Sequence, residues 1–286
     1  MPGIASAATS IVIAHVAAGT KTIRVGAGGI MLPNHAPLVV AEQFGTLESL
    51  FPGRIDLGLG RAPGSDPVTA RAMRRTLHSD PDDFPHDVLE LMSYFHPEDG
   101  QMVRAIPGSG LDVPIWILGS SLFGAQIAAM LGLPFAFASH FAAAQMMDAI
   151  AIYRERFTPS AQLEQPYLIA GAGAIAAESA ESAAEQFEAT RVARAKNVFN
   201  RGDRRLSDEE AESLLRSPQG AVVDEMFTYT GVGTADQVAA YLDGFQEKTG
   251  ADELITVHLA GSVGERVRSV ELLGGALDEA RKIKSQ

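Results

Sequence analysis

Three short segments of the chain combine glycine with residues that bind anions or flat rings. They are Gly28–Gly29, Gly60–Arg61 and Gly119–Ser121. A double glycine lets a flat ligand lie against the backbone. Arginine donates two parallel hydrogen bonds to a phosphate, and the free N–H groups at a helix start attract the same anion. These residue types predict a site for one flat ligand that carries a phosphate.

Each segment also has an explanation that involves no ligand. Gly28–Gly29 also fits a simple bend in the chain. Arg61 also fits a surface ion pair with Asp66, and the serines also fit an N-cap of the next helix. Because the three segments follow successive apolar runs, their joint appearance favours a ligand site at the carboxyl ends of neighbouring strands.

Other chemistries find little support in the sequence. The glycines of Gly58–Gly64 have the spacing GxGxxxG with Pro63 between them, whereas a dinucleotide fingerprint is GxGxxG. No HExxH motif or cluster of ligand residues predicts a metal site, and no GxSxG motif predicts a serine hydrolase. The absence of cysteine excludes disulfides and thiolate chemistry. His140 and His258 end apolar runs, where a histidine is more often a hydrogen-bonded core residue than a base.

The composition restricts the partners. The net charge of the 286 residues is −12, which argues against a nucleic-acid partner because phosphate binding needs a basic face. No segment reaches about 18 uninterrupted apolar residues, so no membrane span is expected. The N-terminal apolar run has no basic segment before it and does not read as a signal peptide. We therefore expect a cytoplasmic protein.

The elements that must hold the three segments follow from the apolar runs. These runs are short, continuous and separated by helical segments, which is typical of a parallel sheet covered by helices. Six strands are predicted, at residues 23–28, 55–59, 114–119, 134–138, 167–171 and 254–259. We expect one domain over residues 1–286, with polar excursions at about 62–112 and 200–230.

Three longer motifs resemble the bacterial-luciferase-like flavin-dependent monooxygenases. They are TKTIRVGAGGIMLPNHAPLVVAEQFGTLESLFPGRIDLGLGRAPG, PIWILGSSLFGAQIAAMLGLPFAFASHF and VGTADQVAAYL. The resemblance covers nearly the whole chain and is tightest over residues 20–64 and 114–141. Within that family it is closest to the small single-chain luciferase-like oxidoreductases.

The resemblance implies a (β/α)8 TIM-barrel-type fold of class α/β. Members of the family carry a further strand, helix and strand before the point that matches the start of this chain. The resemblance therefore implies an N-terminally incomplete barrel, with six of the eight strands. It also implies a homodimer, and a substrate pocket and lid formed by the two excursions.

The same resemblance implies that FMN lies at the carboxyl rim of the barrel. A non-proline cis peptide at Gly28–Gly29 would lie under the flavin ring, Arg61 would contact the phosphate, and His140 falls where luciferase has a tryptophan near the flavin. The implied cofactor contacts are Gly28, Gly29, Arg61, Ile117, Leu118, Gly119, Ser120, Ser121 and His140. No catalytic residue is identified, and no metal is expected.

The implied activity is that of a monooxygenase or oxidoreductase. It would use O₂ and reduced FMN, supplied by a flavin reductase, on a small organic substrate. Two alternatives stay open: hydride transfer with the deazaflavin F420 in the same fold, and a non-catalytic flavin-binding or truncated homologue.

Overall fold

The computed structural model describes residues 7–62, 83–200 and 205–284. Contacts within the chain divide it into two compact units. The first unit comprises residues 1–135 and 152–166, and the second comprises residues 136–151 and 167–286. This division leaves the prediction of one domain over residues 1–286 open.

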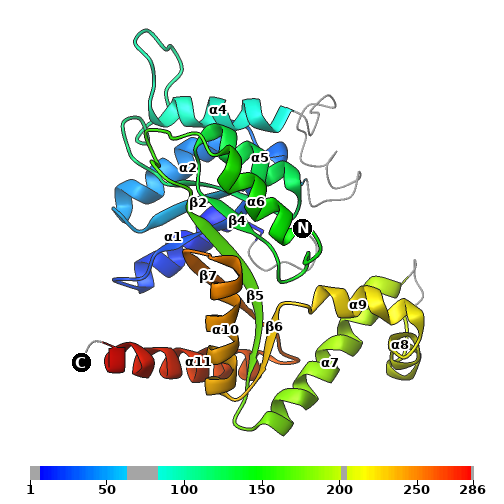
Figure 1. Ribbon diagram of the computed structural model, residues 1–286. Helices are drawn as coiled ribbons and strands as arrows, with labels where there is room; N and C mark the ends of the chain where they lie inside the picture. Colours follow the sequence, from blue (N-terminus) through cyan, green and yellow to red (C-terminus); the bar gives the residue numbers. More distant parts are fainter. Residues whose placement is uncertain (1–6, 63–82, 201–204, 285–286) are drawn as a thin grey trace. The chain divides into compact units, whose positions relative to one another are not determined.

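The first unit is built on three parallel strands in the order β1–β2–β3 (Figure 1). Its elements in chain order are α1 (Thr9–Gly19), β1 (Val25–Met31), η1 (Leu32–Asn34), α2 (Pro37–Leu50), β2 (Ile55–Gly60), α4 (Phe84–Phe95), β3 (Ile115–Gly119) and α5 (Leu122–Leu131). Helix α2 packs against both α1 and α4. The strands are thus separated by helices, as the continuous apolar runs predict.

Apolar burial and end signals explain these elements. Ile55, Leu57 and Leu59 of β2 are fully buried, so this strand supplies the centre of the core. Helix α2 begins at Pro37, whose missing N–H costs nothing in a first turn. Helix α5 is followed by Gly132 in the left-handed conformation, with φ of 63°.

A polar cluster ties the three strands together near the amino ends of β2 and β3. Arg24 donates from Nε to Oδ2 of Asp56 at 2.8 Å and from Nη2 to Oδ1 at 2.7 Å. Trp116 donates from Nε1 to Oδ1 of the same carboxylate at 3.1 Å. Asp56 therefore links β2 to the residue before β1 and to β3.

The second unit is built on β5, which pairs in parallel with both β6 and β7. Its elements are β5 (Leu168–Ala176), α7 (Ala180–Phe199), α8 (Asp208–Leu215), η3 (Pro218–Gly220), α9 (Ala221–Met226), β6 (Thr230–Gly233), α10 (Ala235–Thr249), β7 (Glu253–His258) and α11 (Val263–Lys284). Figure 1 shows α7 leading to α8 and α9. Strand β4 (Phe135–Phe137) and helix α6 (Met146–Arg156) cross the division between the units.

The described residues contain seven strands, one more than the six predicted. The additional strand is β6, whose four residues include Gly231 and Gly233. Glycine is depleted in strands, so this segment gives no strand signal in the sequence. Pairing with Gly173–Ala176 of β5 defines it instead.

The two predicted excursions have different outcomes. Residues 63–82 of the first lie outside the described part of the chain, and α4 follows them. In the second, the described residues 205–230 contain α8, η3 and α9, and Ala211, Val223 and Phe227 pack in a cluster with Ala195 of α7. The role of both excursions in substrate binding stays a prediction. Among the described helices, none combines the length and apolar character needed to cross a membrane.

Candidate cofactor site

The register of the first unit brings the ends of the three strands that carry the predicted segments to one edge of the sheet. Met31 of β1 lies opposite Gly60 of β2, and Gly60 lies opposite Leu118 of β3. The carboxyl ends of the three strands are therefore neighbours. This is the edge at which parallel α/β folds bind ligands.

Arg61 directly follows β2 and lies against the start of α5. Its guanidinium carbon is 4.1 Å from the ring centroid of Phe123, the second residue of that helix. A cation over an aromatic face is attracted to it, so the ring holds the guanidinium near the first turn of α5. The alternative partner of Arg61, Asp66, lies outside the described residues.

The start of α5 leaves its amide groups available to an anion. Ser121 occupies the N-cap position in extended backbone conformation, but its side chain accepts no capping hydrogen bond. The interpretation of the serines as an N-cap is therefore confirmed for the position of Ser121, without the side-chain hydrogen bond that usually accompanies it. Ser120 is exposed, and the first N–H groups of a helix have no partner within it. These N–H groups lie at the positive end of the helix dipole, which favours a phosphate.

Close packing places this helix start directly on the end of β3. A Cβ atom on Gly119 would lie 3.3 Å from the Cα of Gly124 and 3.2 Å from the ring of Phe135. Close packing thus explains why glycine occupies both position 119 and position 124. Of the two residues before Gly119, Ile117 is buried and donates its N–H to the carbonyl of Pro134 at 3.0 Å, whereas Leu118 is half-buried.

The predicted cis peptide is present between Gly28 and Gly29. We expected this peptide at the end of the strand, but β1 continues to Met31 after a break in register between Ala27 and Ile30. The two glycines differ in their surroundings. A Cβ on Gly29 would lie 2.7 Å from the carbonyl oxygen of Gly58, whereas a Cβ on Gly28 would meet nothing within 4 Å. Among the described residues, Gly28 therefore borders open space three residues before the end of β1.

His140 belongs to the second unit, so its predicted place beside the other residues stays a prediction. It is half-buried, and its Nδ1 has no hydrogen-bond partner among the described residues. Its neighbour Ser139 donates to the carbonyl of Gly171 at 2.5 Å. Burial, reinforced by the charge of Arg194, lowers the pKa of His140 below the usual 6.5.

A family model decides what kind of protein carries this site. The model, described as luciferase-like monooxygenase, matches residues 2–253. The chain belongs to the luciferase-like monooxygenase family. A luciferase-like monooxygenase of Escherichia coli (strain K12) is 46% identical over 276 residues, which cover 95% of this chain and 82% of that protein.

Solved structures of luciferase-like proteins confirm the fold class. Apo-MsnO8 superposes with a TM-score of 0.82 at 32% identity, covering 94% of this chain and 82% of that chain. Two further structures share the fold alone. The oxygenating constituent of 3,6-diketocamphane monooxygenase from the CAM plasmid of Pseudomonas putida, in complex with FMN, is 17% identical with a TM-score of 0.61, covering 92% of this chain and 81% of that chain. An F420-dependent secondary alcohol dehydrogenase is 14% identical with a TM-score of 0.64, covering 92% of this chain and 82% of that chain. The TIM-barrel-type fold is thus present, with seven described strands where a closed (β/α)8 barrel has eight.

Sequence reasoning missed one residue of this candidate site, Phe123. It lies beside the predicted serines, but its contact with Arg61 joins two elements that are distant in the chain. No periodicity or motif marks such a contact. Within the described residues, no group of three or more histidine, aspartate or glutamate side chains is arranged to hold a metal.

The two half-buried histidines of the second unit predict a pH dependence of stability. Burial lowers the pKa of both His140 and His258 from the usual 6.5. Below pH 6.5 the unfolded chain takes up protons that the folded chain does not. The free energy of unfolding should therefore decrease as the pH decreases. We expect a contribution below about 1 kcal/mol for each, because both are partly exposed.

Urea unfolding at pH 7.5 and pH 5.5 tests this expectation. The double variant His140→Asn, His258→Asn should lose less stability over this interval than the wild type, since the titration of the carboxylates is common to both. Equal losses in the two proteins would show that these histidines do not contribute.

Proposed function

We propose that this protein is a flavin-dependent monooxygenase that binds reduced FMN at the carboxyl ends of β1, β2 and β3. The observation that carries the proposal is the position of Arg61, whose guanidinium lies over Phe123 at the start of α5. A fixed cation beside the free N–H groups of a helix start is an anion site with two independent sources of attraction.

The residues present suit a phosphate-bearing ring. The phosphate would be held by Arg61, Ser120 and Ser121, and the ring would lie in the open space beside Gly28. A side chain at position 28 would project into that space, whereas glycine leaves it free. The membership of the family supports the same assignment.

Reduced FMN would supply the activation of O₂ for transfer of an oxygen atom to a small organic substrate. The contribution of the chain is binding and orientation. Arg61 and the start of α5 would fix the phosphate end, and the backbone of Gly28 would fix the face of the ring. The buried side chains of β2 and β3 would keep water from the side of the site that faces the core.

Titration of the purified protein with FMN and with F420, followed by visible absorbance, tests the cofactor. We expect saturable perturbation of the flavin bands. Binding of F420 alone would favour the alternative of hydride transfer with F420, the cofactor named for a secondary alcohol dehydrogenase with this fold. Binding of neither would contradict the proposed site.

A coupled assay tests turnover. With a flavin reductase, NADH and a panel of small organic substrates, at least one product should gain an oxygen atom from ¹⁸O₂. Flavin binding without oxygen incorporation for any substrate would favour a non-catalytic flavin-binding protein. The homodimer and the reductase partner belong to this proposal, and light scattering of the purified protein measures the former.

A further inference from the structure

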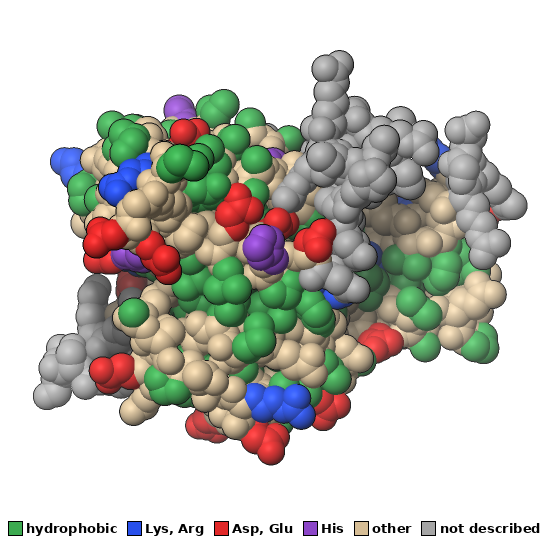
Figure 2. Space-filling model, turned by 90° about the horizontal axis from the view of Figure 1, so that it is seen from above, with side chains coloured by type: hydrophobic (Ala, Val, Ile, Leu, Met, Phe, Trp, Pro, Cys, Tyr) green, Lys and Arg blue, Asp and Glu red, His purple; other side chains and the backbone are tan. Residues whose placement is uncertain are grey.

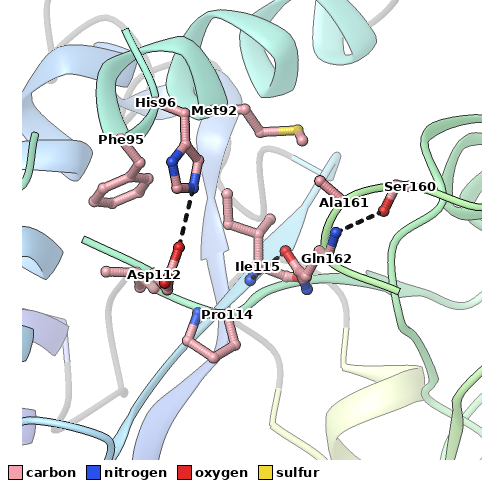
Figure 3. A pocket seen from close by; sticks show the side chains of 10 residues that line it. Met92, Phe95, His96, Asp112, Pro114, Ile115, Ser160, Ala161 and Gln162 are labelled. Carbon is pink, nitrogen blue, oxygen red and sulfur yellow. Dashed lines mark hydrogen bonds and ion pairs between the residues drawn. The ribbon is translucent and has the colours of Figure 1, made fainter. Parts of the chain in front are cut away.

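A cavity lies in the first unit, at the amino end of β3. Its volume is about 390 Å³, within the range of small-molecule sites, which is roughly 300–1,000 Å³. Its walls come from the end of α4, the residues that lead into β3 and the turn at residues 160–162 (Figure 3). We propose that this cavity binds a small molecule with an apolar body and a positively charged amino or amidino group.

The floor of the cavity is apolar. Phe95, Val113 and Ile115 are buried, and Met92 and Pro114 complete this floor. Phenylalanine and methionine together suit the flat or branched hydrocarbon body of a small ligand. An aromatic ring or a short alkyl chain would therefore replace water on this floor.

The polar groups of the turn are already used within the protein. Gln162 donates from Nε2 to the carbonyl of Ile115 at 2.9 Å and accepts the N–H of Ile115 at 3.4 Å. Ser160 donates to the carbonyl of Gly132 at 2.8 Å and accepts the N–H of Gln162 at 3.1 Å. These bonds fix the wall and leave little polar capacity for a ligand on this side.

The polar groups of the other wall are His96 and Asp112, which face each other in Figure 3. Nε2 of His96 is 3.6 Å from Oδ1 of Asp112, which is too far for a hydrogen bond and forms an ion pair only when the imidazole is protonated. The side chain of Asp112 is 95% exposed, so its carboxylate keeps acceptor positions for another donor. A carboxylate beside an apolar floor selects a cationic head group on an apolar body.

The charge of the whole chain has the same sign as this carboxylate. The net charge is −12, and Figure 2 shows a face on which red acidic side chains are spread and blue basic side chains are few. Such a field raises the local concentration of small cations and lowers that of small anions. It therefore favours an amine over an organic acid of the same shape.

The cavity is separate from the candidate cofactor site. Ile115 is the first residue of β3 and Gly119 the last, so the strand places the two sites about 13 Å apart at about 3.3 Å per residue. A ligand in the cavity therefore does not compete with a phosphate at the start of α5, and the proposal does not depend on the nature of the cofactor.

A titration of the full chain with phenethylamine, followed by ¹⁵N–¹H correlation spectra, tests the proposal. We expect saturable shifts at Ile115, Ala161 and Gln162, with a dissociation constant in roughly the millimolar range. Binding of 3-phenylpropionate, which has a similar body and the opposite charge, should be at least about fivefold weaker. Saturating FMN should leave the amine affinity unchanged.

Two variants and one control locate the binding. Asp112→Asn should weaken phenethylamine about fivefold, and Ala161→Phe should abolish its binding, because Ala161 is an exposed lining residue whose enlargement fills the cavity. Asp99→Asn removes the same charge from an exposed aspartate that does not line the cavity, and should have no effect. Circular dichroism confirms that each variant is folded.

Four results would overturn the proposal. They are the absence of saturable binding, equal binding of 3-phenylpropionate, displacement of the amine by FMN, and retention of full affinity in both Asp112→Asn and Ala161→Phe.

Discussion

Replacement of Arg61 by alanine is expected to weaken FMN binding by about 10- to 100-fold. Hydrogen bonds to charged groups contribute about 1.5–3 kcal/mol, and about 1.4 kcal/mol corresponds to a factor of ten in affinity. Arg61 lies against the start of α5, where the phosphate of the cofactor would contact it. The affinity for riboflavin, which has no phosphate, should stay the same. Absorbance or fluorescence titration with both flavins measures the two constants.

Matched variants separate the effect of the planar guanidinium from that of charge alone. Arg61→Lys keeps the positive charge but loses the planar fork, so it should give an intermediate loss. Arg104→Ala removes an exposed arginine from the connection between α4 and β3 and should change neither constant. An equal loss of riboflavin affinity in Arg61→Ala, or no loss of FMN affinity, would contradict the phosphate assignment.

Replacement of Gly58 by alanine is expected to lower the free energy of unfolding by about 2–4 kcal/mol. A Cβ at this position of β2 would lie within contact of the carbonyl oxygen of Ala27 on β1, at only 2.2 Å. Ala27 is paired with Leu57 of β2, and Gly58 is paired with Trp116 of β3, so neither main chain can move away without disturbing the sheet. Urea unfolding of the two proteins measures the difference.

Gly60 provides the control on the same strand. A Cβ there would have the carbonyl oxygen of Ile30 as its nearest neighbour, at 3.9 Å, which is ordinary contact. Gly60→Ala should therefore change the free energy of unfolding by less than about 1 kcal/mol. Similar losses for the two variants would mean that the strands do not approach each other as closely as the structure has them.

The strands and helices were predictable where apolar burial defines them. Ile55, Leu57 and Leu59 are apolar and buried, and their segment forms β2 within one residue of the expected end. The short strand β6 was not predictable, because its two glycines carry no strand preference and only its pairing with β5 defines it. Local signals indicate elements with their own apolar pattern, and they fail where a neighbour imposes the conformation.

The candidate site shows the same limit. Glycine, arginine and serine at strand ends indicated the three segments, because residue type alone suits these positions. The contact between Arg61 and Phe123 was not predictable, since it depends on how closely α5 packs on β3 through Gly119 and Gly124. The cavity at the amino end of β3 gave no signal in the sequence either, because its lining comes from three segments that share no motif.

The position of Trp116 allows the unfolding of the first unit to be followed separately. It is the single tryptophan of the sequence, and it lies on β3 with its indole bonded to Asp56 of β2. Tryptophan fluorescence during unfolding therefore reports the separation of β2 and β3, whereas far-ultraviolet circular dichroism reports the helices of both units. Coincident transitions would mean that residues 1–286 unfold as one cooperative domain, and separate transitions would mean that each unit has a stability of its own.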